Sequence, residues 1–309
     1  MGAFQAAKGT VVTDFTNATL LWTRTNETSF GTIKSDAQGM EEAQAGYATA
    51  ASYVVANAPT AMCSALATRT ALELVLTSNF GAFAAGAFTL ATQVTDSRWL
   101  TLAFVENAAG GTQRLVRLRD GWAHKVSLVL DGRGALVMEA EFAARVPLTQ
   151  LLNAGGVTLP AAPMNPSREV FPGADTHARF TRDPAGANVQ LRTRSLRLTF
   201  DQGLSHEYSM GTGLFEVSKQ GKLRARVEMT GDYSDETWVE LANSFAGTKQ
   251  RHRLVCDTEN ALSTLMIDLY EVQWEIPVVG HEGRSYRELS IAGEAHVLSA
   301  GNFVSIGLT

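Results

Sequence analysis

Residues 125–145 read KVSLVLDGRGALVMEAEFAAR, and this stretch decides the fold. Val126, Leu128 and Leu130 alternate with other residues, and a turn follows at residues 131–134. After the turn, the apolar set continues as Leu136, Met138, Ala140, Phe142 and Ala144. A period of two sends one set of side chains to a core and the other set to solvent or to a partner. The stretch therefore predicts two long paired strands.

A similar pattern occurs again between residues 195 and 230. Leu196, Leu198 and Phe200 alternate with Ser195, Arg197 and Thr199. After a longer excursion through residues 203–221, the apolar residues are Leu223, Ala225, Val227 and Met229. A duplicated β-unit with long, well-patterned strands and no catalytic constellation predicts a protein with a structural role. We therefore expect assembly rather than chemistry.

Length and composition place this chain among globular proteins. Its 309 residues can form one large domain or two of ordinary size, and 45% of them are hydrophobic against 18% charged. The 26 basic and 31 acidic residues give a net charge of −5. Phosphate neutralisation needs clustered Lys and Arg, so this balance argues against a nucleic-acid-binding surface. It is compatible with a surface that must not hold DNA.

The cysteines and the N-terminus point to a reducing compartment. Cys63 and Cys256 are too far apart in the sequence for a metal knuckle or a disulfide framework. The N-terminus lacks a basic segment followed by an apolar one, so we expect no signal peptide and synthesis in the cytoplasm. Residues 74–95 carry no charge, but Ser, Asn, Thr and Gln interrupt them. We expect a helix end, a Gly/Ala loop and a strand there rather than a membrane span.

Weaker patterns predict the rest of the first half. Pro59 can open a helix with a core-facing stripe formed by Cys63, Leu66, Ala67, Thr70, Leu74 and Thr77. The other expected elements are a strand pair at 10–24, a helix or an ordered surface excursion at 37–58, strands at 98–106 and 113–119, and a helical turn or two at 148–153.

Six of the eight prolines lie between residues 147 and 184, which predicts a connector and a domain boundary near residue 156. Beyond it, Ser234 or Asp235 caps a helix that Gly247 ends. The expected core stripe of this helix is Trp238, Leu241, Ala242 and Phe245. The later elements are strands at 251–257, 265–276 (with a bulge where the phase flips at Leu269–Tyr270) and 287–298, and an apolar arm at 303–308 that could finish the sheet or reach a neighbouring chain.

Motifs for catalysis or cofactor binding are missing from the sequence. The six histidines are scattered singly, without the i, i+4 spacing of a zinc helix. Gly211 and Gly213 begin like a dinucleotide fingerprint, but Glu216 occupies the position of the third glycine. There is no phosphate loop and no Gly-x-Ser-x-Gly elbow. We expect no enzyme, no cofactor and no metal site.

Several segments in residues 115–309 resemble a known family. They are Gly121–Gly134, Phe171–Ala174, Arg194–Phe200, Arg226–Asp235 (a strand leading into a helix) and Trp274–Val279. In their order they resemble the major tail tube proteins of bacteriophages with long non-contractile tails (siphophages), in the form that carries two tail-tube folds in tandem.

The resemblance implies a mainly β fold of two tandem tail-tube-like β-sandwich or barrel domains, each with a flanking short helix. The first domain would span residues 1–156, with an Ala-rich excursion at 34–95, and the second would span 157–309. Copies of the chain would form homotrimeric rings of pseudo-sixfold symmetry, and the rings would stack into a virion tail tube for DNA ejection. The implied partners are the tape measure, tail terminator and distal tail proteins, with DNA only in transit and no membrane.

The site residues follow from placing the duplicated strands in such a tube. Candidates for the channel lining are the acidic residues Glu139, Glu141 and Glu228, because an acidic wall repels phosphates. Candidates for contacts between subunits are Arg145, Arg224, Arg226, Phe303 and Ile306. Three alternatives remain open: a soluble β-sandwich that binds carbohydrate through Trp22 or Trp122, a capsid or tail-terminator subunit, and an enzyme on a β-scaffold.

Overall fold

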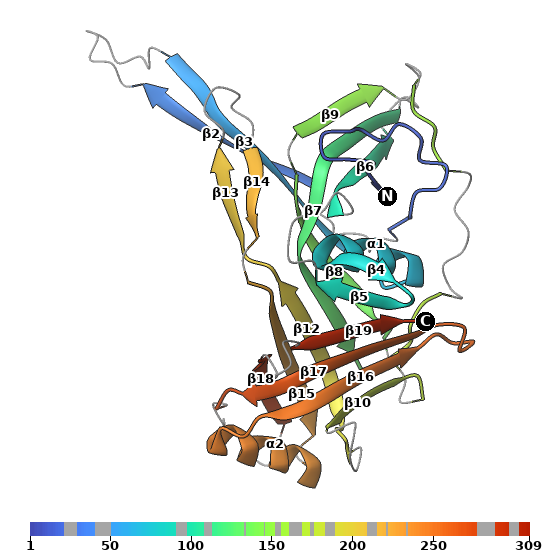
Figure 1. The fold of residues 1–309 in the computed structure, drawn as a ribbon, viewed down its shortest axis with the longest axis vertical. Helices are drawn as coiled ribbons and strands as arrows, with labels where there is room; N and C mark the ends of the chain where they lie inside the picture. The colour runs from blue at the N-terminus through green and yellow to red at the C-terminus, as the bar shows by residue number, and fades with distance from the viewer. Residues whose placement is uncertain are drawn as a thin grey trace.

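The structure, a computed structural model, describes residues 1–21, 30–40, 51–90, 98–107, 113–132, 134–144, 146–151, 156–160, 169–173, 176–182, 189–208, 215–220, 222–232, 234–276, 288–296 and 303–309. This part of the chain is mainly β, with two helices, and its strand pairings are antiparallel (Figure 1). The expected mainly β fold is confirmed.

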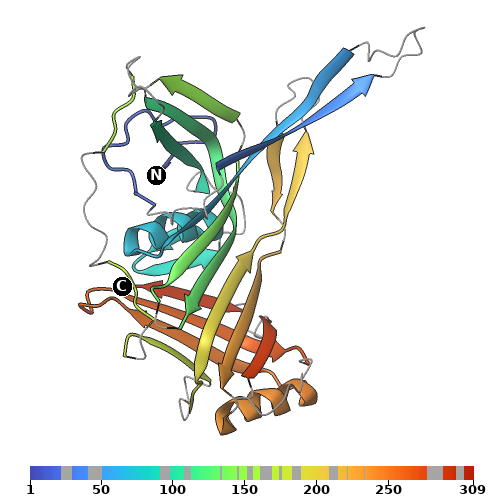
Figure 2. The same cartoon turned by 180° about the vertical axis from the view of Figure 1, so that it is seen from behind.

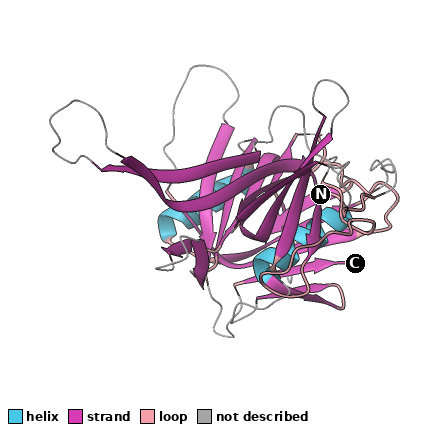
Figure 3. Ribbon diagram, turned by 90° about the horizontal axis from the view of Figure 1, so that it is seen from above, coloured by secondary structure: helices cyan, strands magenta, loops and turns pink. Residues whose placement is uncertain are grey.

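The first half of the chain contains β1 (Gly2–Phe4), β2 (Phe30–Met40), β3 (Ala51–Leu66), α1 (Arg69–Phe80), β4 (Gly81–Ala84), β5 (Ala87–Leu90), β6 (Leu100–Asn107), β7 (Gln113–Asp131), β8 (Val137–Ala143) and β9 (Val146–Leu151). The second half contains β10 (Ala178–Arg182), β11 (Val189–Gln190), β12 (Thr193–Asp201), β13 (Leu204–Tyr208), β14 (Phe215–Gln220), β15 (Arg224–Asp232), α2 (Asp235–Ala246), β16 (Gln250–Asp257), β17 (Thr264–Trp274), β18 (Glu288–Ala295) and β19 (Val304–Leu308). Figure 3 shows how strands dominate the fold.

Strands of both halves form one continuous sheet. Its central part runs in the order β2–β3–β8–β7–β12–β15–β18. The two halves join at the antiparallel pair β7·β12, where the ladder extends from Lys125 opposite Asp201 to Asp131 opposite Ser195. A ladder of backbone hydrogen bonds, rather than a linker alone, therefore holds the halves together.

The strand pairings of the first half are repeated in the second. In the first half, β1 pairs with β6, β6 with β7, β7 with both β8 and β9, β8 with β3, and β3 with β2. In the second half, β10 pairs with β16, β16 with β17, β17 with both β18 and β19, β18 with β15, and β15 with β12. A helix follows β3 and another follows β15. We call residues 2–151 the first repeat and residues 178–308 the second repeat.

This repeat differs from the duplication that the sequence pattern suggested. The sequence equated β7 and β8 with β12 and β15, whereas the pairings equate β7 and β8 with β17 and β18, and β12 and β15 with β2 and β3. All of these strands alternate apolar and polar residues because one face is buried, so alternation cannot tell one position in the sheet from another.

The longest strands of the two repeats, β7 and β17, turn at equivalent places. β7 pairs with β9 as far as Arg119 and with β8 from Trp122, and β17 pairs with β19 as far as Leu269 and with β18 from Val272. Between these segments lie two non-glycine residues with positive φ, Asp120 at 53° and Glu271 at 46°. The bulge predicted at Leu269–Tyr270 is confirmed by a register shift at this point. At each of these places one long strand changes its pairing partner from one neighbour to another.

Both helices have well-formed ends. Thr68 caps α1 by accepting a hydrogen bond from the Ala71 backbone, and Ser234 forms a capping box with Thr237 in α2. Each helix has twelve residues and ends at a glycine in the left-handed region, with φ of 107° at Gly81 and 64° at Gly247. The α2 boundaries predicted from the sequence are confirmed.

Several first-half predictions are wrong. For residues 37–58 the helix is wrong and the alternative, an ordered surface excursion, is confirmed in the described part, because β2 and β3 run as a long antiparallel pair that leaves the body of the molecule (Figure 2). Pro59 lies inside β3, and α1 begins only at Arg69. Residues 148–151 belong to β9, and residues 10–21 contain isolated bridges instead of a strand pair. In β3 and β9, pairing with neighbouring strands outweighs local propensity.

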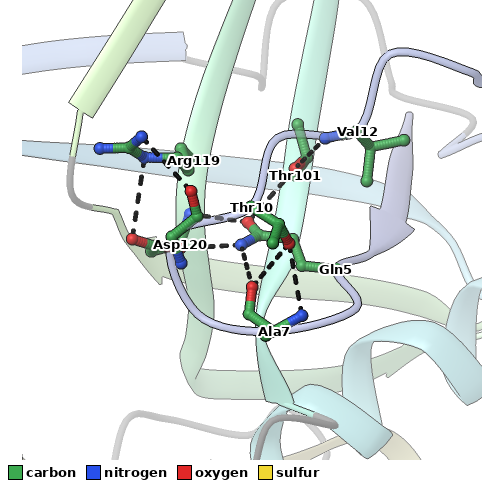
Figure 4. A network of polar contacts seen from close by, with 8 residues as sticks. Gln5, Ala7, Thr10, Val12, Thr101, Arg119 and Asp120 are labelled. Carbon is green, nitrogen blue, oxygen red and sulfur yellow. Dashed lines mark hydrogen bonds and ion pairs between the residues drawn. The ribbon is translucent and has the colours of Figure 1, made fainter.

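A polar network fastens the N-terminal segment to β6 and β7 (Figure 4). Gln5 donates from Nε2 to Asp120 Oδ1 at 2.8 Å, and its Oε1 accepts from the Asp120 backbone N–H at 2.8 Å and from the Thr101 hydroxyl at 3.2 Å. The Gly9 N–H donates to the same Asp120 oxygen at 2.7 Å. These bonds hold the left-handed backbone of Asp120 in place.

α1 lies at the boundary between the repeats, whereas α2 lies at the far end of the molecule (Figure 1). The Phe80 ring packs edge-on against Phe200 of β12 with centroids 5.5 Å apart. The Asn79 carbonyl accepts a hydrogen bond from Gln202, and Arg69 donates to Ser263 at 3.3 Å. The second repeat therefore contacts α1 at both of its ends, while β7, β4 and β5 of the first repeat pack along it.

Candidate functional site

The central sheet has one face in the core and one polar face, and the polar face is the candidate site. Residues opposite each other on adjacent antiparallel strands share a face. One row across the sheet consists of Ser64, Glu139, Ser127, Thr199, Arg226 and Glu294. Neighbouring rows contain Met62, Glu141, Lys125, Asp201 and Arg224, and then Val129, Arg197, Glu228 and Ala292. The opposite face carries buried residues, such as Leu128, Leu198 and Val227.

Acidic side chains outnumber basic ones on this face. Among the described side chains, the seven acids are Asp131, Glu139, Glu141, Asp201, Glu228, Glu275 and Glu294, and the four bases are Lys125, Arg197, Arg224 and Arg226. The described part of the face thus has a net charge of −3. This excess repels polyanions, and most of the positive charges are held by carboxylates of the same chain.

Ion pairs between strands of the sheet hold Lys125 and Arg197 in place on the polar face. Lys125 Nζ lies 2.6 Å from Glu141 Oε1. Arg197 binds Glu139 with two hydrogen bonds of 2.7 and 3.3 Å. Because this contact is bidentate, it fixes the orientation of the guanidinium as well as its position. These partnerships join β7 to β8 and β12 to β8.

Arg226 lies between two carboxylates. Its Nε is 3.0 Å from Glu228 Oε1, and its Nη1 is 2.9 Å from Glu275 Oε1. The hydrogen bond to Glu228 raises the pKa of Arg226, and the charge of Glu275 raises it further. Removing either acid leaves the other as a partner.

Hydroxyl pairs continue the polar surface between the charged rows. Ser127 lies 3.0 Å from Thr199, and Ser195 lies 2.6 Å from Thr230, oxygen to oxygen. An open hollow of 620 Å³ lies over the end of the face where β12, β15 and β18 run together. The face offers short hydroxyl and carboxylate groups along its whole width.

The structure places the predicted channel and contact residues as follows. Glu139, Glu141 and Glu228 share one face, as an acidic wall requires, and Arg224 and Arg226 lie on the same face, where Arg226 pairs with acids of its own chain. Their neighbour Arg197 could not be recognised from the sequence as a partner of Glu139, because the pairing of β12 with β7 is a long-range contact. Lys125 pairs with Glu141 on the adjacent strand β8. The predicted contact residue Arg145 lies outside the described residues.

The C-terminal arm completes the sheet, which is the first of the two expected alternatives. β19 pairs with β17 and with β5. Ile306 is 1% exposed, so its side chain belongs to the core and the expectation of a contact between subunits is corrected for this residue. Phe303 is half-buried against the same core.

A second polar cluster lies beneath α2, and the sequence did not predict it. Glu240 is fully buried, and its carboxylate lies 3.0 Å from Arg182 Nη1, 3.3 Å from His252 Nε2 and 2.6 Å from Trp274 Nε1. Burial raises the pKa of Glu240, but the hydrogen bond with His252 and the charge of Arg182 outweigh it and hold the pKa below its ordinary value. Glu240 therefore remains ionised at neutral pH and anchors α2.

The tryptophans do not form an exposed binding platform in the expected place. Trp122 is fully buried and packs edge-on against Trp99, with centroids 6.2 Å apart. Trp22 lies outside the described residues. Trp238 was expected in the core but is 53% exposed on α2.

No group of three or more His, Cys, Asp or Glu among the described residues could hold a metal ion. Neither α1 nor α2, the two helices in that part of the chain, is long and apolar enough to cross a membrane. Comparison with known proteins adds no identification: no family model matches the chain, and no curated protein matches it significantly.

Proposed function

We propose that this chain is a structural virion protein whose copies join into rings, and that the rings stack into the tail tube of a siphophage. In this proposal the two repeats are tandem tail-tube-like domains, within residues 1–156 and 157–309. Three chains then make a homotrimeric ring of pseudo-sixfold symmetry. The observation that carries the proposal is the β7·β12 ladder, in which one repeat extends the sheet of the other.

Among the described residues, each strand of this ladder has a counterpart in the other repeat that lacks the corresponding partner. β12 corresponds to β2, and among the described strands β2 pairs only with β3. β7 corresponds to β17, whose continuation runs beside β18 through a hydrogen bond of 2.7 Å from Glu275 N to Ala292 O. A second copy can therefore place its β2 beside this continuation, as β12 lies beside β7. Repetition of this join adds four strands per repeat and closes a ring without exposed edges.

In such a ring the polar face would line the channel. The core face of the sheet is covered by α1 and the remaining strands, so the thick side of each copy would face outward. Glu139, Glu141 and Glu228 then belong to the channel wall. A wall with net negative charge lets DNA pass without binding it, and it leaves room for a tape measure protein before ejection.

The proposal also assigns partners and location. The tail terminator and distal tail proteins would close the two ends of the tube. The chain would be made in the host cytoplasm and would act in the virion. It would act without catalysis or a cofactor.

Negative-stain electron microscopy of the purified protein at increasing concentration tests the proposal. We expect rings or tubes with a central channel, and a sedimenting species of three chains or multiples of three. A protein that stays monomeric at high concentration would refute the assembly. A Glu139→Lys, Glu228→Lys variant tests the channel: if it still assembles, it should retain short DNA in a salt-dependent manner that the wild type lacks. The matched control is Glu259→Lys, at an exposed position of the β16–β17 turn.

A further inference from the structure

The α2 helix buries mostly polar residues and exposes large apolar ones, which is the reverse of what a helix that only covers a core shows. Its buried residues are Thr237, Glu240, Leu241 and Ser244, so three of the four are polar. Its exposed side carries large apolar residues, with Trp238 53% exposed and Phe245 60% exposed. We call the surface formed by Trp238, Val239, Ala242 and Phe245 the α2 patch.

The exposure of the patch follows from how α2 is anchored. Glu240 points into the core and is held there by Arg182, His252 and Trp274. Turning the helix to bury Trp238 would move this carboxylate away from its partners and leave Arg182 without its buried acid. The anchor therefore fixes the aromatic side chains outward. Together Trp238 and Phe245 leave on the order of 250 Å² of apolar surface in water, which approaches the few hundred Å² above which an exposed apolar patch marks an interaction site.

The first repeat shows what covers a helix in this position. α1 and α2 both have twelve residues between a side-chain cap and a left-handed glycine, so they correspond position by position. Leu72 then corresponds to Trp238, and Asn79 corresponds to Phe245. Leu72 and Asn79 are fully buried. The second repeat contributes to this cover at the C-terminal end of α1, where the Asn79 backbone carbonyl accepts from Gln202 Nε2 and the adjacent Phe80 packs against Phe200.

We infer that the α2 patch is a contact surface for a second copy of this chain, and that the first repeat of that copy covers it. In the described part of the chain the second repeat follows the first and contacts α1, whereas α2 lies at the far end of the molecule (Figure 1). The covered α1 is thus the internal template for the uncovered α2. This inference rests on the proposed assembly and adds a side-chain contact to its backbone ladder.

The patch also matches what a contact between copies needs. Tryptophan and phenylalanine are among the residues enriched at protein interfaces, and tryptophan is a frequent hot spot. Ala242 is exposed between them and lets a neighbouring backbone approach closely. Charged side chains are depleted at the centre of such interfaces, and the four residues of the patch carry none.

Two measurements on the full-length protein test the inference. The first compares the wild type with Trp238→Ser, Phe245→Ser, using sedimentation and electron microscopy at several concentrations. We expect the concentration for half-assembly to rise at least tenfold, while far-UV circular dichroism stays unchanged. The matched control is Leu262→Ser, because Leu262 is 73% exposed but lies at the other end of β16 from α2. This control should shift assembly less than twofold.

The second measurement is hydroxyl-radical footprinting of the wild type, which does not depend on whether a variant folds. Trp238 and Phe245 should be oxidised in the monomer and protected in the assembly. An assembly in which both residues stay reactive and the double variant assembles normally would overturn the inference while the proposed tube stands, and the patch would then face a different protein. A wild type that never assembles would overturn both. Protection of the patch together with loss of assembly in the double variant alone supports the inference.

Discussion

Replacing the buried anchor of α2 tests the energetic reasoning most directly. Glu240→Ala removes a fully buried carboxylate and leaves Arg182, His252 and Trp274 facing the gap. Breaking a buried ion pair by removing one partner costs about 3–5 kcal/mol of unfolding free energy. Glu240→Gln keeps the shape and one acceptor oxygen, so we expect a loss of about 1–3 kcal/mol. Urea unfolding followed by tryptophan fluorescence measures both variants.

The pH dependence of the same variants supplies an independent check. The folded pKa of Glu240 lies below its unfolded value, so its stabilisation is present above the unfolded pKa of about 4.3 and is lost as pH falls through the folded pKa. The wild type should therefore lose more stability than Glu240→Gln on going from pH 5 to pH 3. The control Glu259→Gln, at an exposed position, should stay within about 0.5 kcal/mol of the wild type. A Glu240→Ala loss below 1 kcal/mol, or equal pH slopes, would refute the anchor.

Three further changes test other parts of the fold. Burial raises the pKa of Cys63 to about 11 and that of Cys256 to about 12, so neither thiol should react with Ellman's reagent at pH 8 until urea unfolds the chain; rapid reaction in native buffer would contradict their placement. Gly293→Ala should lower the melting temperature by several degrees, because its Cβ would lie 2.8 Å from the Trp274 ring and 2.9 Å from a backbone oxygen; differential scanning fluorimetry measures this, and an unchanged midpoint would argue against so close a crossing of β17 and β18. Glu271→Gly should be neutral or stabilise the fold by up to about 1 kcal/mol in urea unfolding, because it relieves a positive φ; a clear loss would show that the side chain matters more than the backbone strain.

The strands and caps that depend on local pattern could be predicted from the sequence. The alternation around Leu128 and Leu198 correctly gave β7, β8, β12 and β15, and the pair Ser234 and Gly247 gave both ends of α2. The phase flip at Leu269 located the bulge of β17. Each of these features is determined by residues within a few positions of one another, which is the range that periodicity and capping rules cover.

Features that depend on distant partners could not be predicted. The Ala-rich residues of β3 have high helix propensity, but β8 pairs with Thr60–Leu66 and holds them extended. The buried face of α2 was predicted wrongly, because Glu240 has three partners on β10, β16 and β17. No local rule indicates that this glutamate is buried and that Trp238 is exposed. The polar face required the β7·β12 register, which brings Arg197 within reach of Glu139.

The β4–β5 hairpin follows α1 directly, and through β5 it pairs with β19 of the other repeat. After α2 the chain goes straight from Gly247 to β16, with no such insertion. The junction between the two repeats of one chain therefore has an additional strand pairing, β5·β19, that a junction between separate molecules would lack. Under mechanical force or heating, a closed assembly should therefore separate first at the junctions between molecules. The two repeats of each molecule should stay paired with each other.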